Sequence, residues 1–302
     1  MQGTWAGGAH VLVARETLVA ISALSAKGPS EPDTAVPVDA PARLELEDVS
    51  LGYDGRFVLR DVTLQIPHGA RVAVVGPNGA GKSTLFKALA GLLPVRSGHI
   101  LIHCQPLGSH QDCIAYVPQR EDVDWRFPVT VADVVMMGRY GRMGWLRRPN
   151  AEDRAVVARS LEQMGIAALA SRRIGELSGG QQQRAFLARA LAQEPHILLM
   201  DEPFSGVDVG TQEATLALLD RLREQGVTTL VSTHDLTLAA TRFEYAMLLN
   251  RRLVAFGPVG QVFTPEALTG TFGGQVFFIG DGLDGAVVVD QCCPPAADES
   301  AL

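Results

Sequence analysis

The chain has 302 residues, of which 47% are hydrophobic, with a net charge of -7 and a pI of about 5.5. This length suits one large domain or two modest ones with a sizeable core. The acidic balance argues against nucleic acid as the main partner. No run of 18 apolar residues occurs, so the sequence contains no candidate transmembrane helix.

The first 42 residues differ from the rest of the chain. They are rich in Gly, Ala, Ser and Pro, and residues 27–41 have the composition of a linker. Residues 1–24 could form a weak amphipathic helix, but they lack the charged and apolar regions of a signal peptide. A downstream start would need a non-ATG codon, because no internal Met precedes Met136. We favour a disordered extension.

Cysteines give little functional information. Four are present: Cys104, Cys113, Cys292 and Cys293. They form no CxxC pair and no zinc-type quartet, and reduced thiols in a cytosolic protein are the simplest interpretation. The adjacent pair near the C-terminus could be a redox or metal site, but we favour an incidental pair in a loose tail.

The globular part begins with β-type patterns. Residues 43–51 alternate polar and apolar, which predicts a half-buried strand, and residues 52–55 predict a turn. Two more short strands are expected at 57–59 and 62–66, so an antiparallel β-subdomain precedes the nucleotide motif. Tyr53 on the turn could stack on a base, although a tyrosine in such a turn is more often surface or partial core.

A P-loop follows an apolar strand at residues 72–75. The motif is Gly76-Pro77-Asn78-Gly79-Ala80-Gly81-Lys82-Ser83-Thr84, and a helical pattern follows it. Glycines let the backbone approach phosphate oxygens, and the amides at the helix start form an anion cradle. Lys82 would reach the β- and γ-phosphates and the Ser83 hydroxyl would ligate Mg²⁺. A glycine-rich turn that binds nothing is the other reading, but the flanking strand and helix favour the P-loop.

The middle of the chain carries two further candidate positions. Gln119 follows a predicted strand at 114–117, where it could ligate Mg²⁺ or orient water. Residues 121–185 read mainly as helix, with a basic, aromatic loop at 138–149 that suits phosphate, nucleic acid or protein docking. Ser178, Gly179 and Gly180 precede a helical run at 185–191, which indicates either a second phosphate site or a simple capped junction.

Two adjacent acids end the next apolar strand, Ile197–Met200. Asp201 can hold Mg²⁺ and Glu202 can polarise an attacking water. Because two carboxylates at a buried strand end are costly without a cation, the functional interpretation is favoured. An amphipathic helix at 214–224 and a strand at 227–233 lead to His234, at the strand end where ligands bind in α/β sheets. A hairpin is expected at 246–257, and the element order is an α/β pattern.

In this order the motifs resemble those of the ATP-binding subunit of an ABC transporter, over roughly residues 43–260. The resemblance implies an α/β fold: a P-loop NTPase (RecA-like) ABC ATPase core with an antiparallel β-subdomain and a helical signature subdomain at about 121–185. Residues 1–42 and 261–302 would be extensions, the C-terminal one ending in a disordered tail.

The resemblance also assigns roles to residues. The matched motifs are the A-loop Tyr53, Walker A at 76–83, the Q-loop Gln119, the LSGGQ signature at 177–181, Walker B at 197–201 with the catalytic base Glu202, the D-loop at 205–208 and the H-loop His234. Nucleotide contacts would come from Tyr53, Gly76, Pro77, Asn78, Gly79, Ala80, Gly81, Lys82, Ser83, Thr84, Ser178, Gly179, Gly180, Gln181 and Asp208. Lys82, Gln119, Glu202 and His234 would be catalytic, and Ser83, Gln119 and Asp201 would hold Mg²⁺. The D-loop reads Ser-Gly-Val-Asp where Ser-Ala-Leu-Asp is commoner, and we do not expect this to affect activity.

The family resemblance implies a mechanism and partners. Two copies would pair head-to-tail, with each ATP between Walker A of one and LSGGQ of the other. Closure would drive integral membrane permease subunits, which dock on the helical subdomain and the Q-loop region. An extracytoplasmic solute-binding protein would deliver cargo, no nucleic acid would bind, and the subunit would lie peripherally on the cytoplasmic face of the membrane.

The cargo is suggested by less specific features. Residues 124–140 and 204–208 resemble the manganese/zinc/iron importer branch, and importers of metal chelates and haem share some of these features. A soluble ABC ATPase is disfavoured, because the chain has one cassette and no sustained heptads. His103, Cys104, His110 and Cys113 cluster in sequence, and we interpret them as incidental.

Overall fold

In the computed structural model, the described residues are 42–108, 113–119, 123, 125–143, 148–273, 276–279 and 286–289. Of the expected N-terminal extension only Ala42 lies among them. The cysteine pair near the C-terminus and His110 also lie outside the described residues. None of the helices within these ranges is long and apolar enough to cross a bilayer.

A six-stranded sheet forms the core, in the order β10-β9-β3-β8-β7-β6. Its strands are β3 (Arg71–Val75), β6 (Ile114–Val117), β7 (Ile197–Met200), β8 (Thr228–Thr233), β9 (Tyr245–Leu249) and β10 (Leu253–Pro258). The first five are parallel, and β10 pairs antiparallel with β9, which confirms the expected hairpin. Strands β7, β8 and β9 are buried along their whole length, as strands of a parallel sheet covered on both faces are, although β8 carries four hydroxyl side chains.

A second, antiparallel sheet has the order β2-β1-β4-β5 and confirms the predicted β-subdomain. It consists of β1 (Ala42–Tyr53), β2 (Arg56–Pro67), β4 (Ser97–Ile102) and β5 (Gln105–Pro106). The prediction of two short strands at 57–59 and 62–66 was wrong, because β2 runs unbroken through the polar residues between them. Asp61 takes a left-handed φ of 51° and its amide donates to Ser50 Oγ at 3.0 Å, so an irregularity in the ladder replaces a turn.

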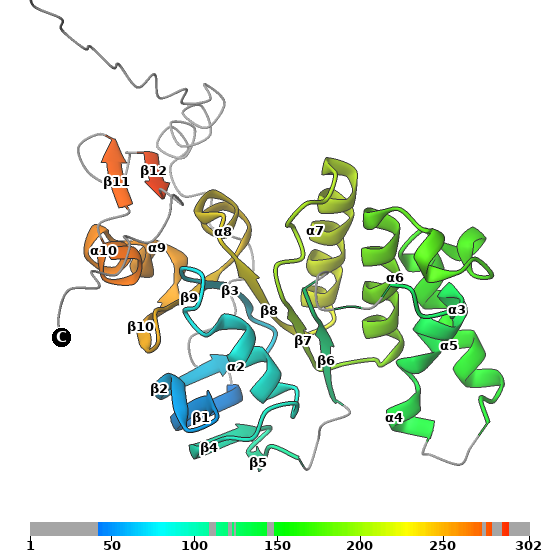
Figure 1. Ribbon diagram of the computed structural model, residues 1–302, viewed down its shortest axis with the longest axis horizontal. Coiled ribbons are helices and arrows are strands. Elements are labelled where there is room, and N and C mark those ends of the chain that lie inside the picture. Colours follow the sequence, from blue (N-terminus) through cyan, green and yellow to red (C-terminus); the bar gives the residue numbers. More distant parts are fainter. Residues whose placement is uncertain are drawn as a thin grey trace, which may run out of the picture.

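Helices surround the core sheet (Figure 1). They are α2 (Lys82–Leu89), α3 (Val131–Met137), α4 (Tyr140–Met143), α5 (Ala151–Gln163), α6 (Gly179–Ala192), α7 (Val209–Glu224), α8 (Leu236–Arg242), α9 (Val259–Val262) and α10 (Pro265–Phe272). Helices α3 to α6 gather at one end of the molecule, while α2 lies on the other side of β6 and β7. Strands β11 (Val276–Ile279) and β12 (Ala286–Val289) form a small antiparallel pair.

Two helices begin earlier than the sequence predicts. Helix α6 begins at Gly179 rather than at residue 185, because Ser178 and Gln181 form a capping box at its start. Helix α7 begins at Val209 rather than at residue 214, because the Asp208 side chain caps it. A cap contributes about 1 kcal/mol, which is similar to the cost of one glycine, as at Gly210 in α7, and offsets part of the cost of the two glycines that begin α6. Helices α8 and α10 were not predicted at all.

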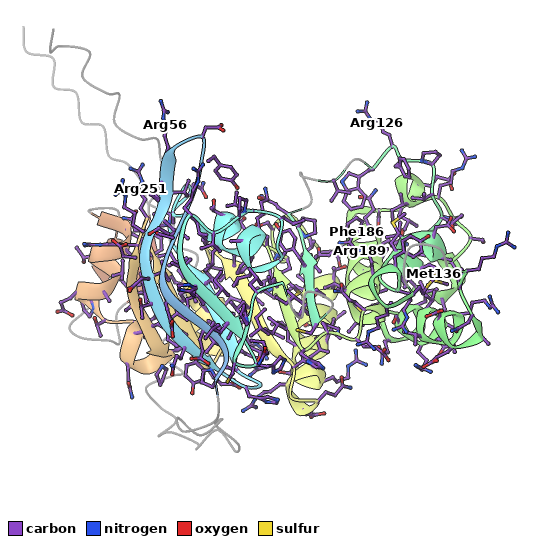
Figure 2. The ribbon with its side chains drawn as sticks, turned by 90° about the horizontal axis from the view of Figure 1, so that it is seen from below. Arg56, Arg126, Met136, Phe186, Arg189 and Arg251 are labelled. Atoms are coloured by element: carbon purple, nitrogen blue, oxygen red, sulfur yellow. The ribbon has the colours of Figure 1, made fainter. Side chains whose placement is uncertain are left out.

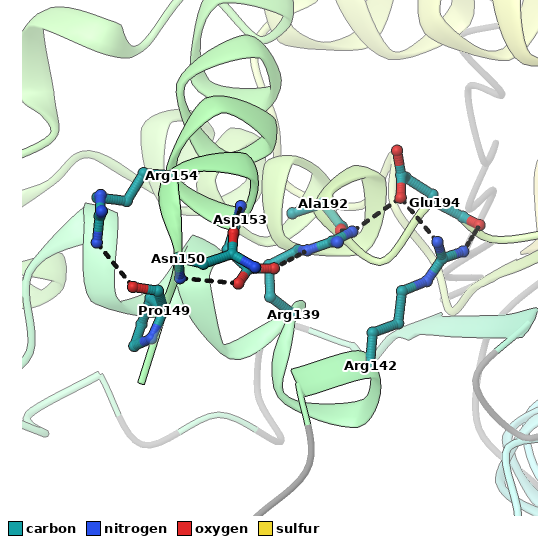
Figure 3. A network of polar contacts seen from close by, with 8 residues as sticks. All are labelled: Arg139, Arg142, Pro149, Asn150, Asp153, Arg154, Ala192 and Glu194. Carbon is teal, nitrogen blue, oxygen red and sulfur yellow. Dashed lines mark hydrogen bonds and ion pairs between the residues drawn. The ribbon is translucent and has the colours of Figure 1, made fainter. Parts of the chain in front are cut away.

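A network of polar contacts ties the helical end together (Figure 3). Arg139 bonds Asp153 at 3.1 Å and Glu194 at 2.8 Å, and the side chains of Arg139 and Asp153 are each only 6% exposed. Asp153 also accepts the Asn150 amide at the start of α5, and this bond, followed by Arg139, holds the pKa of Asp153 below its ordinary value. Arg142 joins the same Glu194 from a more exposed position.

The network yields a stability prediction. Arg139→Ala removes the cation that is hydrogen-bonded to the Asp153 carboxylate, so we expect a loss of about 3 kcal/mol in the free energy of unfolding, measured with denaturant. Arg142→Ala is the matched control: its side chain is 38% exposed, and we expect a loss of under about 1 kcal/mol. Equal losses for the two variants would contradict the account of this network.

Candidate functional site

The carboxyl ends of four core strands bring the predicted site residues to one edge of the sheet. Strand β3 leads into the P-loop at Gly76, β8 leads to His234, β7 leads to Asp201, and β6 leads towards Gln119. The four strands are parallel and adjacent, so their ends lie side by side. In open α/β sheets this edge is where ligands bind.

Two glycines of the P-loop are required by close contacts. A Cβ on Gly76 would lie 2.1 Å from the Leu249 carbonyl oxygen, and one on Gly81 would lie 2.6 Å from the Leu59 side chain. Gly81 also has a φ of 103° and ends the loop where α2 begins. The loop is therefore held between β2 and β9 and presents the amides at the start of α2, an arrangement suited to phosphate.

The Lys82 ammonium lies inside the loop. Lys82 is 6% exposed, and Nζ donates to the carbonyl oxygens of Gly76 at 2.7 Å and Pro77 at 3.2 Å. Burial lowers the pKa of Lys82, and the negative charges of Glu202 and Asp201 oppose that shift. The predicted cation and the two predicted acids are thus close enough to influence one another electrostatically.

A serine that sequence reasoning missed orients both acids. Ser232 Oγ on β8 donates to Asp201 Oδ1 at 2.6 Å and accepts the Glu202 amide at 2.8 Å. Tyr116 on β6 places its hydroxyl 3.5 Å from the other oxygen of Asp201, which is 2% exposed. Nothing local distinguishes Ser232, because it is one of four hydroxyl side chains in this six-residue strand.

Glu202 faces a more open part of the site. Its backbone takes a left-handed φ of 46°, which is unusual for a residue with a side chain. Ser205 Oγ donates to Glu202 Oε2 at 3.0 Å, and His234 Nδ1 lies 3.6 Å from the same oxygen. The His234 side chain is 49% exposed. The carboxylate is therefore aimed at a region that water can enter, as a general base requires.

The signature residues lie against α7. Ser178 Oγ accepts the Gln181 amide and the Gln181 side chain accepts the Ser178 amide, so the capped-junction interpretation is realised. A Cβ on Gly180 would lie 2.5 Å from Thr211 Oγ1 and 2.8 Å from Asp208 Oδ2. Thr211 holds the pKa of Asp208 below its ordinary value through the capping bonds. The signature and the D-loop acid are thus brought together at the starts of α6 and α7, and α6 lies on the other side of β6 and β7 from α2 (Figure 1).

Tyr53 lies at the tip of the β1–β2 hairpin and is 44% exposed. It pairs with Arg56 across a two-residue turn, and Figure 2 shows Arg56 at the far end of this hairpin. Leu59 on the same hairpin contacts the P-loop. The ring of Tyr53 is thus available to a ligand.

Aromatic and cationic side chains link the acids to the helical end. Val117, Trp125 and Phe186 line a small pocket together with Asp201 and Glu202. Trp125 meets the Phe186 ring edge to face, at a centroid distance of 5.1 Å. On α6, the Arg189 guanidinium lies over the same ring at 4.5 Å and donates to the Tyr116 carbonyl oxygen (Figure 2). Burial lowers the pKa of Arg189.

Comparisons with known proteins found one family model and several similar proteins. A family model described as ABC transporter matches residues 59–205. The chain is 48% identical over 238 residues to the manganese transport system ATP-binding protein of Bacillus subtilis, covering 79% of this chain and 95% of the relative. It is 47% identical over 233 residues to the zinc transport system ATP-binding protein of Treponema pallidum, covering 77% of this chain and 88% of that relative. A solved structure of an ABC transporter, described as metal-chelate type and in an inward-facing conformation, is 30% identical in sequence with a TM-score of 0.68. The match covers 77% of this chain and 89% of the chain in that structure.

Ser232 offers a direct test of the site geometry. We expect Ser232→Ala to slow ATP hydrolysis by about ten-fold or more, because residues that orient site ligands typically contribute 10–100-fold. Ser232→Thr keeps the hydroxyl and should retain most of the activity at the same folding stability. A wild-type rate for Ser232→Ala would contradict the role of this hydroxyl.

Proposed function

This chain belongs to the ATP-binding subunits of ABC transporters, and from that membership we propose that it powers the import of a divalent metal ion: manganese, zinc or iron. The observation that best supports this proposal is the extent of the similarity. The match covers 95% of a relative named for manganese transport and 88% of one named for zinc transport. The likeness thus extends well beyond the ATPase motifs.

Import of a metal chelate is the second candidate. It is favoured by the likeness in structure to a transporter of the metal-chelate type, at 30% identity. The two candidates differ in what crosses the membrane, a bare ion or an ion with its organic ligand. Both leave the ATPase chemistry of this subunit unchanged.

The residues at the sheet edge fit ATP with Mg²⁺. Ser83, Gln119 and Asp201 would hold the ion, since all three offer the oxygen ligands that Mg²⁺ prefers, and Ser232 already orients Asp201. When bound, Mg²⁺ supplies positive charge beside the phosphate oxygens. The P-loop amides between 76 and 84, apart from Pro77, which has no N–H, would bind the phosphates, and Lys82 would exchange its carbonyl partners for phosphate oxygens.

The remaining roles follow from position. Glu202 would orient the attacking water and accept its proton, since its carboxylate is fixed by Ser205 and faces an open region. His234, beside that carboxylate, would contact the γ-phosphate. Tyr53, at the hairpin tip, would stack on the adenine.

A complete site requires a second copy of the chain. Residues 178–181 begin α6 and lie against Asp208 at the start of α7, and α6 lies on the other side of β6 and β7 from α2. In a head-to-tail homodimer these residues would face the nucleotide held on the partner's P-loop. The amides of Gly179 and Gly180 at the start of α6 then serve as a second anion site, with the capping box fixing their direction.

Coupling to the membrane would run through the helical end. Arg189 on α6 donates a hydrogen bond to the carbonyl oxygen of Tyr116 on β6, three residues before Gln119. A shift of the Gln119 segment on nucleotide binding would therefore be passed to helices α3 to α6. We place permease docking on this helical region and the Q-loop, with the subunit peripheral on the cytoplasmic face and a solute-binding protein on the other side. The division into an ATP-binding domain at 43–260, with a helical subdomain at about 121–185 and extensions at 1–42 and 261–302, is part of this proposal.

The test is the metal content of cells grown with limiting metal. Cells whose single copy carries Glu202→Gln should show a several-fold fall in one of manganese, zinc or iron, because transport needs hydrolysis. Glu213→Gln, an exposed glutamate on α7, is the matched control and should match wild type. An unchanged content of all three metals would contradict the proposed cargo. A fall seen only when the metal is supplied as a chelate would favour the second candidate.

A further inference from the structure

Two histidines and a buried cysteine from three separate segments converge away from the nucleotide site. His103, Cys113 and His196 each offer one ligand atom, and these atoms all lie within 4.8 Å of one another. His103 Nε2 lies 3.1 Å from His196 Nδ1, and the two rings meet edge to face. The sequence suggested that His103 and Cys113 were incidental, and it gave no reason to add His196.

The backbone fixes two of these residues next to each other. Cys113 directly precedes β6 and His196 directly precedes β7, and the strands pair with Ile114 opposite Ile197. The His196 amide donates to the Cys113 carbonyl oxygen at 2.8 Å. The pair therefore lies at the amino ends of strands whose carboxyl ends carry the ATP site, on the opposite edge of the core sheet.

The third residue comes from the β4–β5 hairpin of the other sheet. Ile102 pairs with Gln105, so His103 and Cys104 form a two-residue turn, with left-handed φ values of 51° and 60°. Such turns usually use Asn-Gly or Gly-Gly, because left-handed backbone is costly for other side chains. Strained residues of this kind cluster at ligand sites. The turn holds the His103 ring against His196.

We propose that His103, Cys113 and His196 form a site for a borderline-soft divalent metal ion, with Zn²⁺ as the best fit. Two imidazole nitrogens and one thiolate suit Zn²⁺, whereas Mn²⁺ prefers oxygen ligands. Nitrogens that each lie about 2.0–2.1 Å from one tetrahedral zinc are about 3.3 Å apart, close to the 3.1 Å between the histidine nitrogens. Water would take the fourth position.

Binding at this site is chemically simple. The Cys113 thiol releases its proton to solvent, and each imidazole binds in its neutral form with its N–H on the other ring nitrogen. Cys113 is buried, while His103 is partly exposed and His196 is exposed, so the ion has an entry route. The bound metal would join the β4–β5 turn to the core sheet. The proposal does not depend on the transported cargo.

The test is a titration of the untagged full chain with Co²⁺ as a spectroscopic probe, after removal of metal. All proteins carry Cys292→Ser and Cys293→Ser, which removes the tail thiols. We expect one equivalent per chain with visible tetrahedral bands and a thiolate-to-Co²⁺ band in the near ultraviolet. Zn²⁺ should displace Co²⁺, and an equal concentration of Mn²⁺ should not.

Single substitutions distinguish metal binding at this site from metal binding by other cysteines. Cys113→Ala should abolish the thiolate band, and His196→Asn, a change at an exposed position, should weaken binding at least ten-fold. Cys104→Ala is the matched control, since it removes an exposed thiol from the same turn, and it should bind as wild type. The proposal is overturned if wild type shows no thiolate band, if the band survives Cys113→Ala, or if it is lost in Cys104→Ala. None of these results bears on cellular metal import.

Discussion

The nucleotide site depends on the pairing of β8 with both β3 and β7. Val75 lies opposite Thr233 and Met200 lies opposite Val231, so the P-loop, His234 and the two acids are fixed by a single register. A slip of one residue would turn every side chain of β8 to the other face. Ser232 depends on this register directly, because its hydroxyl reaches Asp201 and the Glu202 amide only in the observed pairing. Strand β8 thus positions the proposed catalytic groups without being a motif itself.

The starts of α2 and α6, the two proposed phosphate-binding helix ends, lie against different neighbours. The P-loop at the start of α2 lies against β2 of the antiparallel sheet and β9 of the core sheet, and Lys82 lies close to the acids. The start of α6 lies against the D-loop cap, and the helix continues to Arg189 and the buried Arg139 network. One helix therefore carries the signature at one end and anchors the helical region at the other. In the proposed function, this helix would link ATP binding to a membrane partner.

The sequence predicts what short-range chemistry determines. The P-loop, the acids after Ile197–Met200 and the antiparallel sheet could be identified because spacing, apolar runs and alternation are local. Contacts between residues on different strands could not be predicted from the sequence. Ser232 and Asp201 are 31 residues apart, and Tyr116 and Asp201 are 85 apart. Their meeting depends on strand order, and so does the meeting of His103 with His196.

The predicted starts of α6 and α7 and the predicted break in β2 were wrong for a related reason. The glycines after Ser178 predict no helix, because glycine has a low helix propensity. The polar residues near Asp61 predict a break in the strand, because Asp has a low strand propensity. In the structure a capping box and a hydrogen bond to Ser50 Oγ offset those propensities. Site roles such as stacking by Tyr53 stay predictions, because they concern a ligand and a second copy.

The most direct test of the account is complementation between two inactive chains. Lys82→Ala removes the phosphate-binding amine, and Ser178→Arg blocks the exposed start of α6. If each ATP lies between the P-loop of one copy and the signature of the other, a mixed dimer keeps one intact site. With random pairing, half of the dimers are mixed, so the mixture should recover up to about a quarter of wild-type ATPase activity. A mixture as inactive as either variant alone would contradict the shared site.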